Sequence, residues 1–263
     1  MLKPQTRLIG PSTIIECSDK TCLPSSNTMK RFLLTLWNDL LGLFYPRICG
    51  ACGAPLIDGE ELLCLYCLFE LPRLSYHRYP DDENPLRNIF AGCSSVRQVI
   101  AYLHFQKESY VQHLIHEFKY HKNERLAIYI GRLAAEDLQR DGYLTDVDLF
   151  VPVPLHPRKM RQRGYNQSER VARGMASVYH HPIDTTSLIR HTYTKTQTRK
   201  SAYERRQNVK NVFTVAHPER LAGHHILLID DVLTTGSTLL NCIDALRDVP
   251  DLLISIFVVS TVI

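Results

Sequence analysis

The chain has 263 residues, of which 44% are hydrophobic and 22% are charged, and its formal net charge is +4. This composition is typical of a globular protein, and the weak positive charge suits an anionic ligand without indicating nucleic-acid binding. No stretch approaches the roughly 18 consecutive apolar residues that a membrane helix requires, so we expect a cytoplasmic protein without a membrane span.

The first part of the chain differs from the rest in composition. Residues 1–28 are rich in Pro, Ser and Thr and lack periodicity, which predicts a disordered leader or a mis-assigned start before Met29. Residues 29–75 are predicted to hold an amphipathic helix and a small cysteine module. The polar residues that come next predict a linker over 76–96.

Four of the eight cysteines form two C-x-x-C pairs: Cys49, Cys52, Cys64 and Cys67. Each such turn directs two thiolates at one point, and two turns complete a tetrahedron around Zn²⁺. Disulfides or a redox pair would be the alternative, but nothing indicates secretion and a redox motif needs one pair only. Because all four ligands are thiolates, no position stays open for water, and the zinc would be structural.

From about residue 97, predicted strands and helices alternate. Continuously apolar or β-branched runs indicate strands, and apolar residues spaced three and four apart indicate helices. The predicted strands are 97–105, 148–153, 187–193, 225–229 and 252–259. The predicted helices are 109–120, 124–139, one capped by Asn166, and 238–248. This alternation predicts a domain over 97–263 with an open, mostly parallel α/β sheet.

The strand 225–229 runs into two carboxylates, Asp230 and Asp231, and then into a loop of small residues. The loop residues are Thr234, Thr235, Gly236, Ser237 and Thr238. Ligands bind beyond the carboxyl ends of parallel strands, and a loop of small residues before a helix can surround a phosphate with N–H groups. Adjacent carboxylates would repel that phosphate unless sugar hydroxyls or hydrated Mg²⁺ lay between. An ordinary capped helix after a surface strand is the structural alternative.

Two basic segments accompany this loop. The first comes after the strand 148–153 and includes Arg158, Lys159 and Arg163, whose charges suit a pyrophosphate. The second, polar and basic, is predicted to be a lid over a bound polyanion, and it holds Gln197, Arg205 and Arg206. Basic surface loops would show the same composition, so charge alone does not separate the two interpretations.

These motifs carry a resemblance. The acidic pair and its loop resemble the 5-phosphoribosyl-1-pyrophosphate (PRPP) motif of type I phosphoribosyltransferases. In chain order, the C-x-x-C pairs, F-K-Y, V-P-V-P-L-H-P-R-K, R-G-Y-N-Q, E-R-R-x-N-V and D-D-V-L-T-T-G-S-T resemble the ComF family over residues 46 to about 260. That family comprises bacterial proteins implicated in DNA uptake during competence and in related DNA handling.

The resemblance implies a type I phosphoribosyltransferase-like fold with a small N-terminal zinc module. It also implies that Asp230 and Asp231 act on the ribose hydroxyls, that Thr234–Thr238 hold the 5′-phosphate, and that Mg²⁺ accompanies PRPP.

Two functions stay open. One is Mg²⁺-dependent phosphoribosyl transfer to an acceptor that the sequence does not identify. The other is a non-catalytic module that senses PRPP or binds single-stranded DNA, with the zinc module contacting DNA or a protein of competence or DNA processing. Few aromatic residues stand in the basic segments, which leaves a thin stacking platform for single strands.

Overall fold

The computed structural model describes residues 46–80, 83–120, 123–191 and 212–263. The chain divides at Pro46, and the elements described here belong to the unit Arg47–Ile263. The predicted leader and amphipathic helix precede this unit and lie outside the described residues, as do the predicted lid residues Gln197, Arg205 and Arg206.

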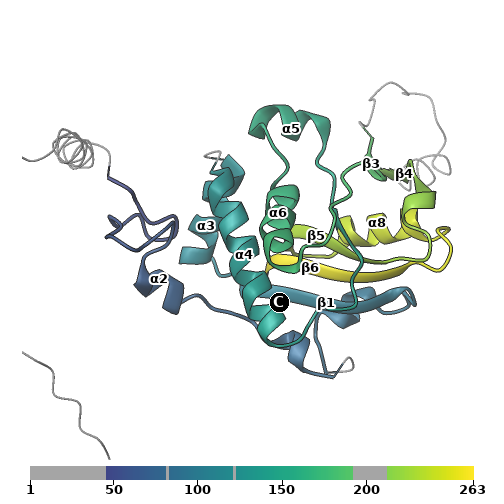
Figure 1. Ribbon diagram of the computed structural model, residues 1–263, viewed down its shortest axis with the longest axis horizontal. Coiled ribbons are helices and arrows are strands. Elements are labelled where there is room, and N and C mark those ends of the chain that lie inside the picture. Colours follow the sequence, from purple (N-terminus) through teal and green to yellow (C-terminus); the bar gives the residue numbers. More distant parts are fainter. Residues whose placement is uncertain (1–45, 81–82, 121–122, 192–211) are drawn as a thin grey trace, which may run out of the picture. The chain divides into compact units, whose positions relative to one another are not determined.

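The described elements, in chain order (Figure 1), are α2 (Leu65–Phe69), η1 (Tyr76–Arg78), η2 (Arg87–Phe90), β1 (Val96–His104), α3 (Tyr110–Tyr120), α4 (Glu124–Arg140), β2 (Leu149–Pro152), α5 (Pro157–Arg163), α6 (Gln167–Tyr179), β3 (Leu188–Arg190), β4 (Phe213–Val215), η3 (Pro218–Arg220), β5 (His225–Leu233), α8 (Ser237–Leu246) and β6 (Leu253–Thr261).

The main sheet has the strand order β1-β6-β5-β2, and all three neighbouring pairs are parallel. The strands end close together at one edge, since Pro152 of β2 pairs with Ile229 of β5, and Leu233 and His104 both pair with Thr261 of β6. The segments after β1, β2 and β5 therefore start at the same edge of the sheet, which confirms the predicted α/β class with a parallel sheet.

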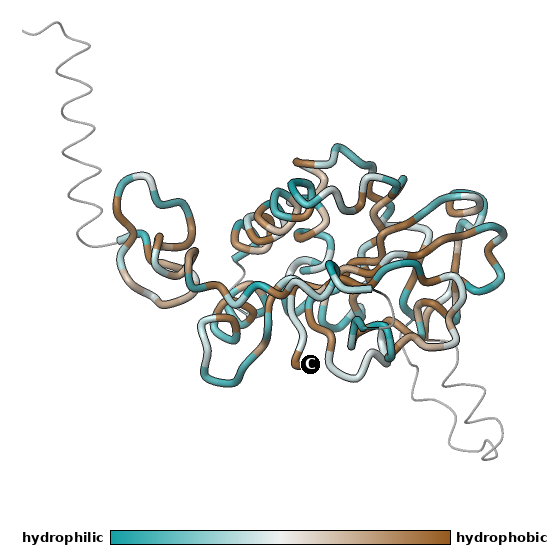
Figure 2. The backbone as a smooth tube through the Cα atoms, turned by 90° about the horizontal axis from the view of Figure 1, so that it is seen from below, coloured by the Kyte–Doolittle hydropathy of each residue, from teal (hydrophilic) through white to brown (hydrophobic). Residues whose placement is uncertain are grey.

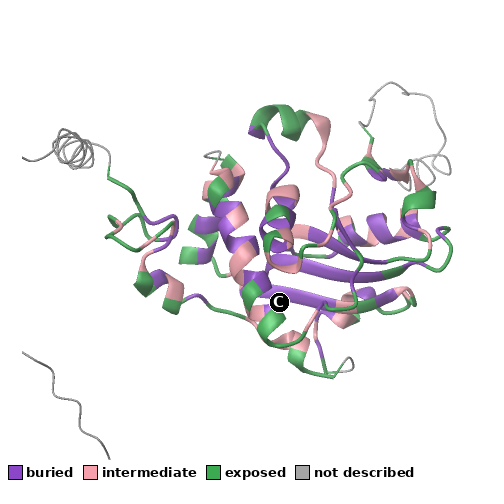
Figure 3. Cartoon of the chain, in the orientation of Figure 1, coloured by how far each residue is buried: buried purple, intermediate pink, exposed green. Residues whose placement is uncertain are grey.

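Both faces of this sheet are buried (Figure 3), which explains why its strands are apolar without alternation. Along β5, Leu227 and Ile229 join a core with α3, α4 and α6, while Ile226 and Leu228 join a second core with α8. Figure 2 shows the corresponding apolar segments running through the middle of the unit.

The helices α4 and α6 pack with backbone against backbone through two glycines. A Cβ atom added at Gly131 would lie 2.2 Å from the carbonyl oxygen of Val171, and one added at Gly174 would lie 2.0 Å from that of Ile128. Both distances are far below van der Waals contact, so only glycine permits this approach. The close packing positions the start of α6 beside the end of β5, where Ser168 and Asp230 meet.

Two segments differ from the sequence prediction. The predicted strand 187–193 shortens to β3, which pairs antiparallel with β4 outside the main sheet. Of the three β3 residues only Leu188 is buried, which suits a strand that covers the edge of a core. The predicted linker 76–96 contributes the fully buried Leu86 and Phe90 to the core beside α8. Apolar residues at 86, 89 and 90 have the spacing of a helical turn, which the polar residues before them obscure.

Within the described residues, none of the helices combines the length and the apolar character that crossing a bilayer requires.

Candidate functional site

The acidic pair lies in the C-terminal half of β5, near the edge where the strands of the sheet end. The strand continues past the predicted boundary to Leu233, so the ladder with β6 holds the backbone of Asp230 and Asp231. One carboxylate oxygen of Asp230 accepts hydrogen bonds from the Ser168 hydroxyl (3.2 Å) and from the backbone N–H of Asp231 (2.9 Å). Burial, and then the charge of Asp231, raise the pKa of Asp230 to about 7.

Asp231 has a different partner, the ammonium group of Lys119. The Nζ atom lies 2.9 Å from Oδ2 of Asp231, and the two side chains are 17% and 16% exposed. Lys119 stands in the last turn of α3, in the F-K-Y motif. In the sequence this motif supports only the family resemblance and predicts no role for Lys119, because no spacing rule connects a helix end to a strand so far along the chain.

The loop after the acidic pair has the backbone that its glycine allows. Gly236 adopts φ +75°, in the left-handed region, and an added Cβ would lie 2.4 Å from Cγ2 of Ile89. Helix α8 then begins at Ser237, one residue before the prediction, and no side chain caps its N-terminus. The hydroxyl of Thr235 donates to that of Ser237, the first residue of the helix, at 3.2 Å. The first N–H groups of α8 have no intrahelical partner.

The predicted basic residues separate into two groups. Arg158 and Lys159 are exposed on α5, which comes after β2 at the same edge of the sheet. Arg163 is buried at the end of that helix, where its Nη1 donates to Oε1 of Gln167 at 2.7 Å and its guanidinium lies over the ring of Tyr120. A ligand contact by Arg163 stays a prediction, and in this structure its charge is directed at protein groups.

The four cysteine sulfur atoms lie within 4.8 Å of one another, close enough to share one metal ion. Backbone N–H groups donate to these sulfur atoms, from Ala51 and Cys64 to Cys49 and from Cys67 to Cys64. Burial raises the pKa of Cys49, but the backbone donors outweigh burial and lower it to about 7. Such N–H donors stabilise a thiolate, so the cluster fits a thiolate-binding metal ion.

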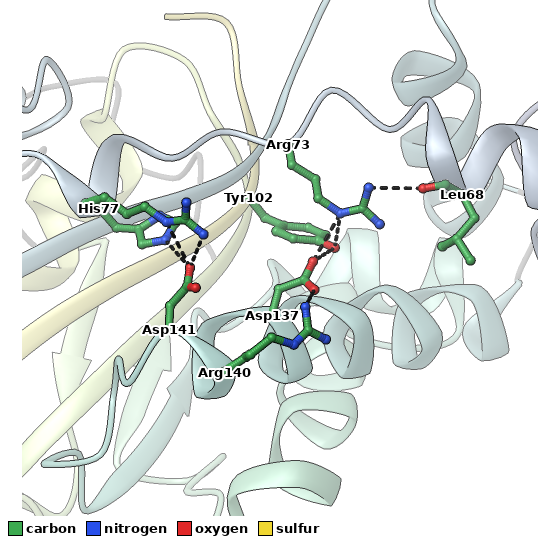
Figure 4. Close-up of polar contacts among 8 residues, drawn as sticks. Leu68, Arg73, His77, Tyr102, Asp137, Arg140 and Asp141 are labelled. Atoms are coloured by element: carbon green, nitrogen blue, oxygen red, sulfur yellow. Dashed lines mark hydrogen bonds and ion pairs between the residues drawn. The ribbon is translucent and has the colours of Figure 1, made fainter.

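A polar network attaches the segment after this cluster to the α/β domain (Figure 4). Asp137 on α4 accepts hydrogen bonds from the Tyr102 hydroxyl (2.8 Å) and from Nε of Arg73 (3.1 Å), while Nη1 of Arg73 donates to the carbonyl of Leu68 at 3.0 Å. The segment after α2 is thereby joined to β1 and α4.

A second carboxylate, Asp141, extends this network. It lies 2.6 Å from Nη2 of Arg78 and 3.5 Å from Nε2 of His77. Burial lowers the pKa of His77 despite the nearby carboxylate, which favours the neutral imidazole at pH 7. Since Arg73 and Arg78 each have a carboxylate partner here, we interpret the network as structural.

The sheet, the acidic pair and the loop after it define a phosphoribosyltransferase-type α/β domain, and comparison with known proteins agrees. The family model "Phosphoribosyl transferase domain" matches residues 169–259. DNA utilization protein YhgH of Escherichia coli K12 is 34% identical over 206 residues, which cover 74% of this chain and 88% of that protein. Competence protein F of Haemophilus influenzae is 34% identical over 132 residues, covering 48% of this chain and 57% of its own length.

The chain belongs to the ComF family, as its motifs predict. Among solved structures, glutamine PRPP amidotransferase from B. subtilis matches 55% of this chain at 18% identity with a TM-score of 0.40, and the match spans only 30% of that enzyme. A purine phosphoribosyltransferase from Pyrococcus horikoshii matches 55% of this chain and 86% of its own at 15% identity, with a TM-score of 0.30.

Proposed function

We propose that this protein binds PRPP beyond the end of β5 and transfers its phosphoribosyl group to an acceptor. The observation that carries the proposal is the sequence of features along one chain segment: a buried parallel strand, Asp230 and Asp231, the left-handed Gly236, and the uncapped start of α8. These features suit a phosphorylated sugar, because its hydroxyls require acceptors and its phosphate requires N–H donors.

In this proposal each group has one task. Asp230 and Asp231 accept hydrogen bonds from the ribose hydroxyls, and residues 234–238 surround the 5′-phosphate. Arg158 and Lys159 approach the pyrophosphate from α5. Mg²⁺, for which adjacent carboxylates are suitable ligands, would supply positive charge for the pyrophosphate oxygens. The acceptor forms its bond to C1 of the ribose as the C1–O bond breaks, and pyrophosphate leaves with the electron pair.

The first test is isothermal calorimetry with PRPP and with ribose 5-phosphate. A charge-assisted hydrogen bond contributes about 1.5–3 kcal/mol, so Asp230→Asn and Asp231→Asn should each weaken PRPP binding by roughly tenfold to a hundredfold. Binding of ribose 5-phosphate should weaken by the same factor, since the sugar contacts are common to both ligands. Asp58→Asn, an exposed carboxylate of the cysteine module, is the matched control.

Substitutions at Arg158 and Lys159 test recognition of the pyrophosphate separately from recognition of the sugar. Arg158→Ala with Lys159→Ala should weaken PRPP much more than ribose 5-phosphate, because only PRPP carries the pyrophosphate. Unchanged PRPP affinity in a variant that combines Asp230→Asn with Asp231→Asn would contradict the proposed site. Release of pyrophosphate, measured over a panel of amine and nucleobase acceptors, then distinguishes a transferase from a protein that only senses PRPP.

For the four-cysteine module we propose a structural zinc ion and a role in protein contact. The module exposes Leu65, Tyr66 and Phe69 on α2, with Phe69 83% exposed. Its charged residues over 47–71 are Arg47 against Asp58, Glu60, Glu61 and Glu70. This acidic balance disfavours a phosphate backbone and favours a protein partner, in agreement with a link to DNA uptake through protein contacts. The affinity for a labelled DNA single strand, measured by fluorescence anisotropy, should therefore be unchanged by Phe69→Ala.

A further inference from the structure

The ion pair between Lys119 and Asp231 places a cation of the protein beside the acidic pair. Of the described residues, Lys119 is the one whose cation lies within ion-pair distance of either carboxylate. The remaining donors to the pair, the Ser168 hydroxyl and the backbone N–H of Asp231, are neutral. One ammonium group therefore faces two adjacent carboxylates, and most of its surface is shielded from water.

The last residue of α5 and the segment after it hold Lys119 in this place. The Tyr165 hydroxyl donates a hydrogen bond to the carbonyl of Phe118, the residue before Lys119. On the other side, the Arg163 guanidinium lies 5.4 Å from the ring centre of Tyr120. Two residues of the R-G-Y motif thus fix both neighbours of Lys119. A lysine that served only the negative end of α3 would need no such support, because a helix end attracts a cation over a broad surface.

We propose that Lys119 is the resident counterion of the acidic pair, and that it excludes free divalent metal ions so that Mg²⁺ enters only as a complex with PRPP. The inference rests on the proposed function. A free metal ion would have to displace an ammonium group that already neutralises Asp231. The PRPP complex supplies phosphate oxygens to the metal ion and new anionic partners to Lys119. These contacts compensate for the displacement of the ammonium group from Asp231.

Lys119 is a positioning residue, and its loss should increase the affinity of the acidic pair for free Mg²⁺. Without its ammonium group, two uncompensated carboxylates lie side by side, and a divalent ion becomes their best partner. A lysine with a merely structural role would lower stability when replaced, but would not create affinity for Mg²⁺.

The experiment is calorimetric titration of the ligand-free protein with Mg²⁺ alone, at constant ionic strength. Lys119→Met should bind free Mg²⁺ at least about tenfold more tightly than the wild type, a change equivalent to about 1.4 kcal/mol. Lys119→Arg should behave as the wild type, and so should Lys107→Met, the exposed control. Adding Asp231→Asn to Lys119→Met should abolish the gain, which assigns the new affinity to the acidic pair.

Lys119→Gln serves where the methionine variant does not fold, since it keeps a hydrogen-bond donor and lacks the charge. Equal Mg²⁺ affinity in wild type and in folded Lys119→Met or Lys119→Gln would overturn the counterion role. A wild type that binds no PRPP would instead defeat the proposed function, and the two failures are distinguishable because the Mg²⁺ titration contains no PRPP.

Discussion

At the end of β5, burial and the neighbouring charge of Asp231 raise the pKa of Asp230 to about 7, whereas an unfolded aspartate titrates near 3.9. The folded state therefore holds this proton more tightly than the unfolded state does. Stability from this group is fully present below about pH 4, declines as the pH rises through the interval between the two pKa values, and is lost above about pH 7. The site thus holds a charge that disfavours the ligand-free fold at neutral pH.

Replacing that charge should stabilise the ligand-free protein. Asp230→Asn keeps the shape of the side chain and removes its ionisation, so we expect a higher melting temperature than the wild type at pH 8 and none of this advantage at pH 4. Thermal unfolding at several pH values measures the difference. Asp58→Asn, on an exposed carboxylate, should show no such pH-dependent gain. A gain of equal size at both pH values would contradict the assigned pKa.

Sequence reasoning predicts some of the residues in this site and misses others. The acidic pair and its loop are predictable because strand, carboxylates, glycine and helix start are consecutive, and local rules apply to consecutive residues. Lys119 is not predictable in this way, since its contact with Asp231 depends on how α3 packs on the sheet. Arg163 illustrates the opposite case: a basic composition predicts an exposed side chain, whereas Arg163 is buried, with the buried Gln167 as its hydrogen-bond partner and the Tyr120 ring beside its guanidinium.

The contact between α4 and α6 depends on two glycines that face carbonyl groups of the opposite helix. A glycine inside a helix normally disfavours it by about 1 kcal/mol relative to alanine. Each glycine therefore lowers the stability of its own helix, and the close packing of the two helices compensates for this loss.

Replacing either glycine by alanine should therefore destabilise the protein, although alanine has the higher helix propensity. We expect Gly131→Ala and Gly174→Ala to lower the free energy of unfolding by about 1–3 kcal/mol, the usual cost of overpacking. Urea denaturation monitored by circular dichroism gives the value. Stabilisation by about 1 kcal/mol, as propensity alone predicts, would show that the helices can separate without loss.

The elements predicted well are those whose pattern is continuous. The apolar runs of β5 and β6 and the periodic α4 agree with prediction to within a few residues of their ends. The strand β3 is predicted as longer and as part of the sheet, because three apolar or β-branched residues suffice for a strand but do not determine its partner. Tertiary context decides such short elements.

The four-cysteine module and the α/β domain share one core. Cys49 and Cys67 are buried in the same cluster as Leu126 of α4 and Leu114 of α3. The Nδ1 atom of His113 lies 3.3 Å from the carbonyl oxygen of Gly50, which adds a polar contact between the module and α3. Loss of the module's internal order should therefore disturb the domain.

Metal removal tests this continuity. The purified protein should carry about one zinc ion per chain, and Cys49→Ser should lose it. A zinc chelator should lower the melting temperature of the α/β domain itself, measured by near-ultraviolet circular dichroism, since the two parts share a core. Cys93→Ser, a cysteine outside the cluster, is the control. A domain transition that is indifferent to the chelator would mean that the module unfolds independently.

The position of β6 between β1 and β5 has a consequence for synthesis on the ribosome. The strand formed by residues 253–261 leaves the exit tunnel after every other strand of the main sheet, yet it is the strand of that sheet with which β1 pairs. Until β6 has emerged, β1 and β5 each expose an unpaired, apolar edge that no earlier strand of the main sheet covers. The nascent chain is therefore a natural client for chaperones, and a ribosome that stalls shortly before residue 253 holds an aggregation-prone intermediate.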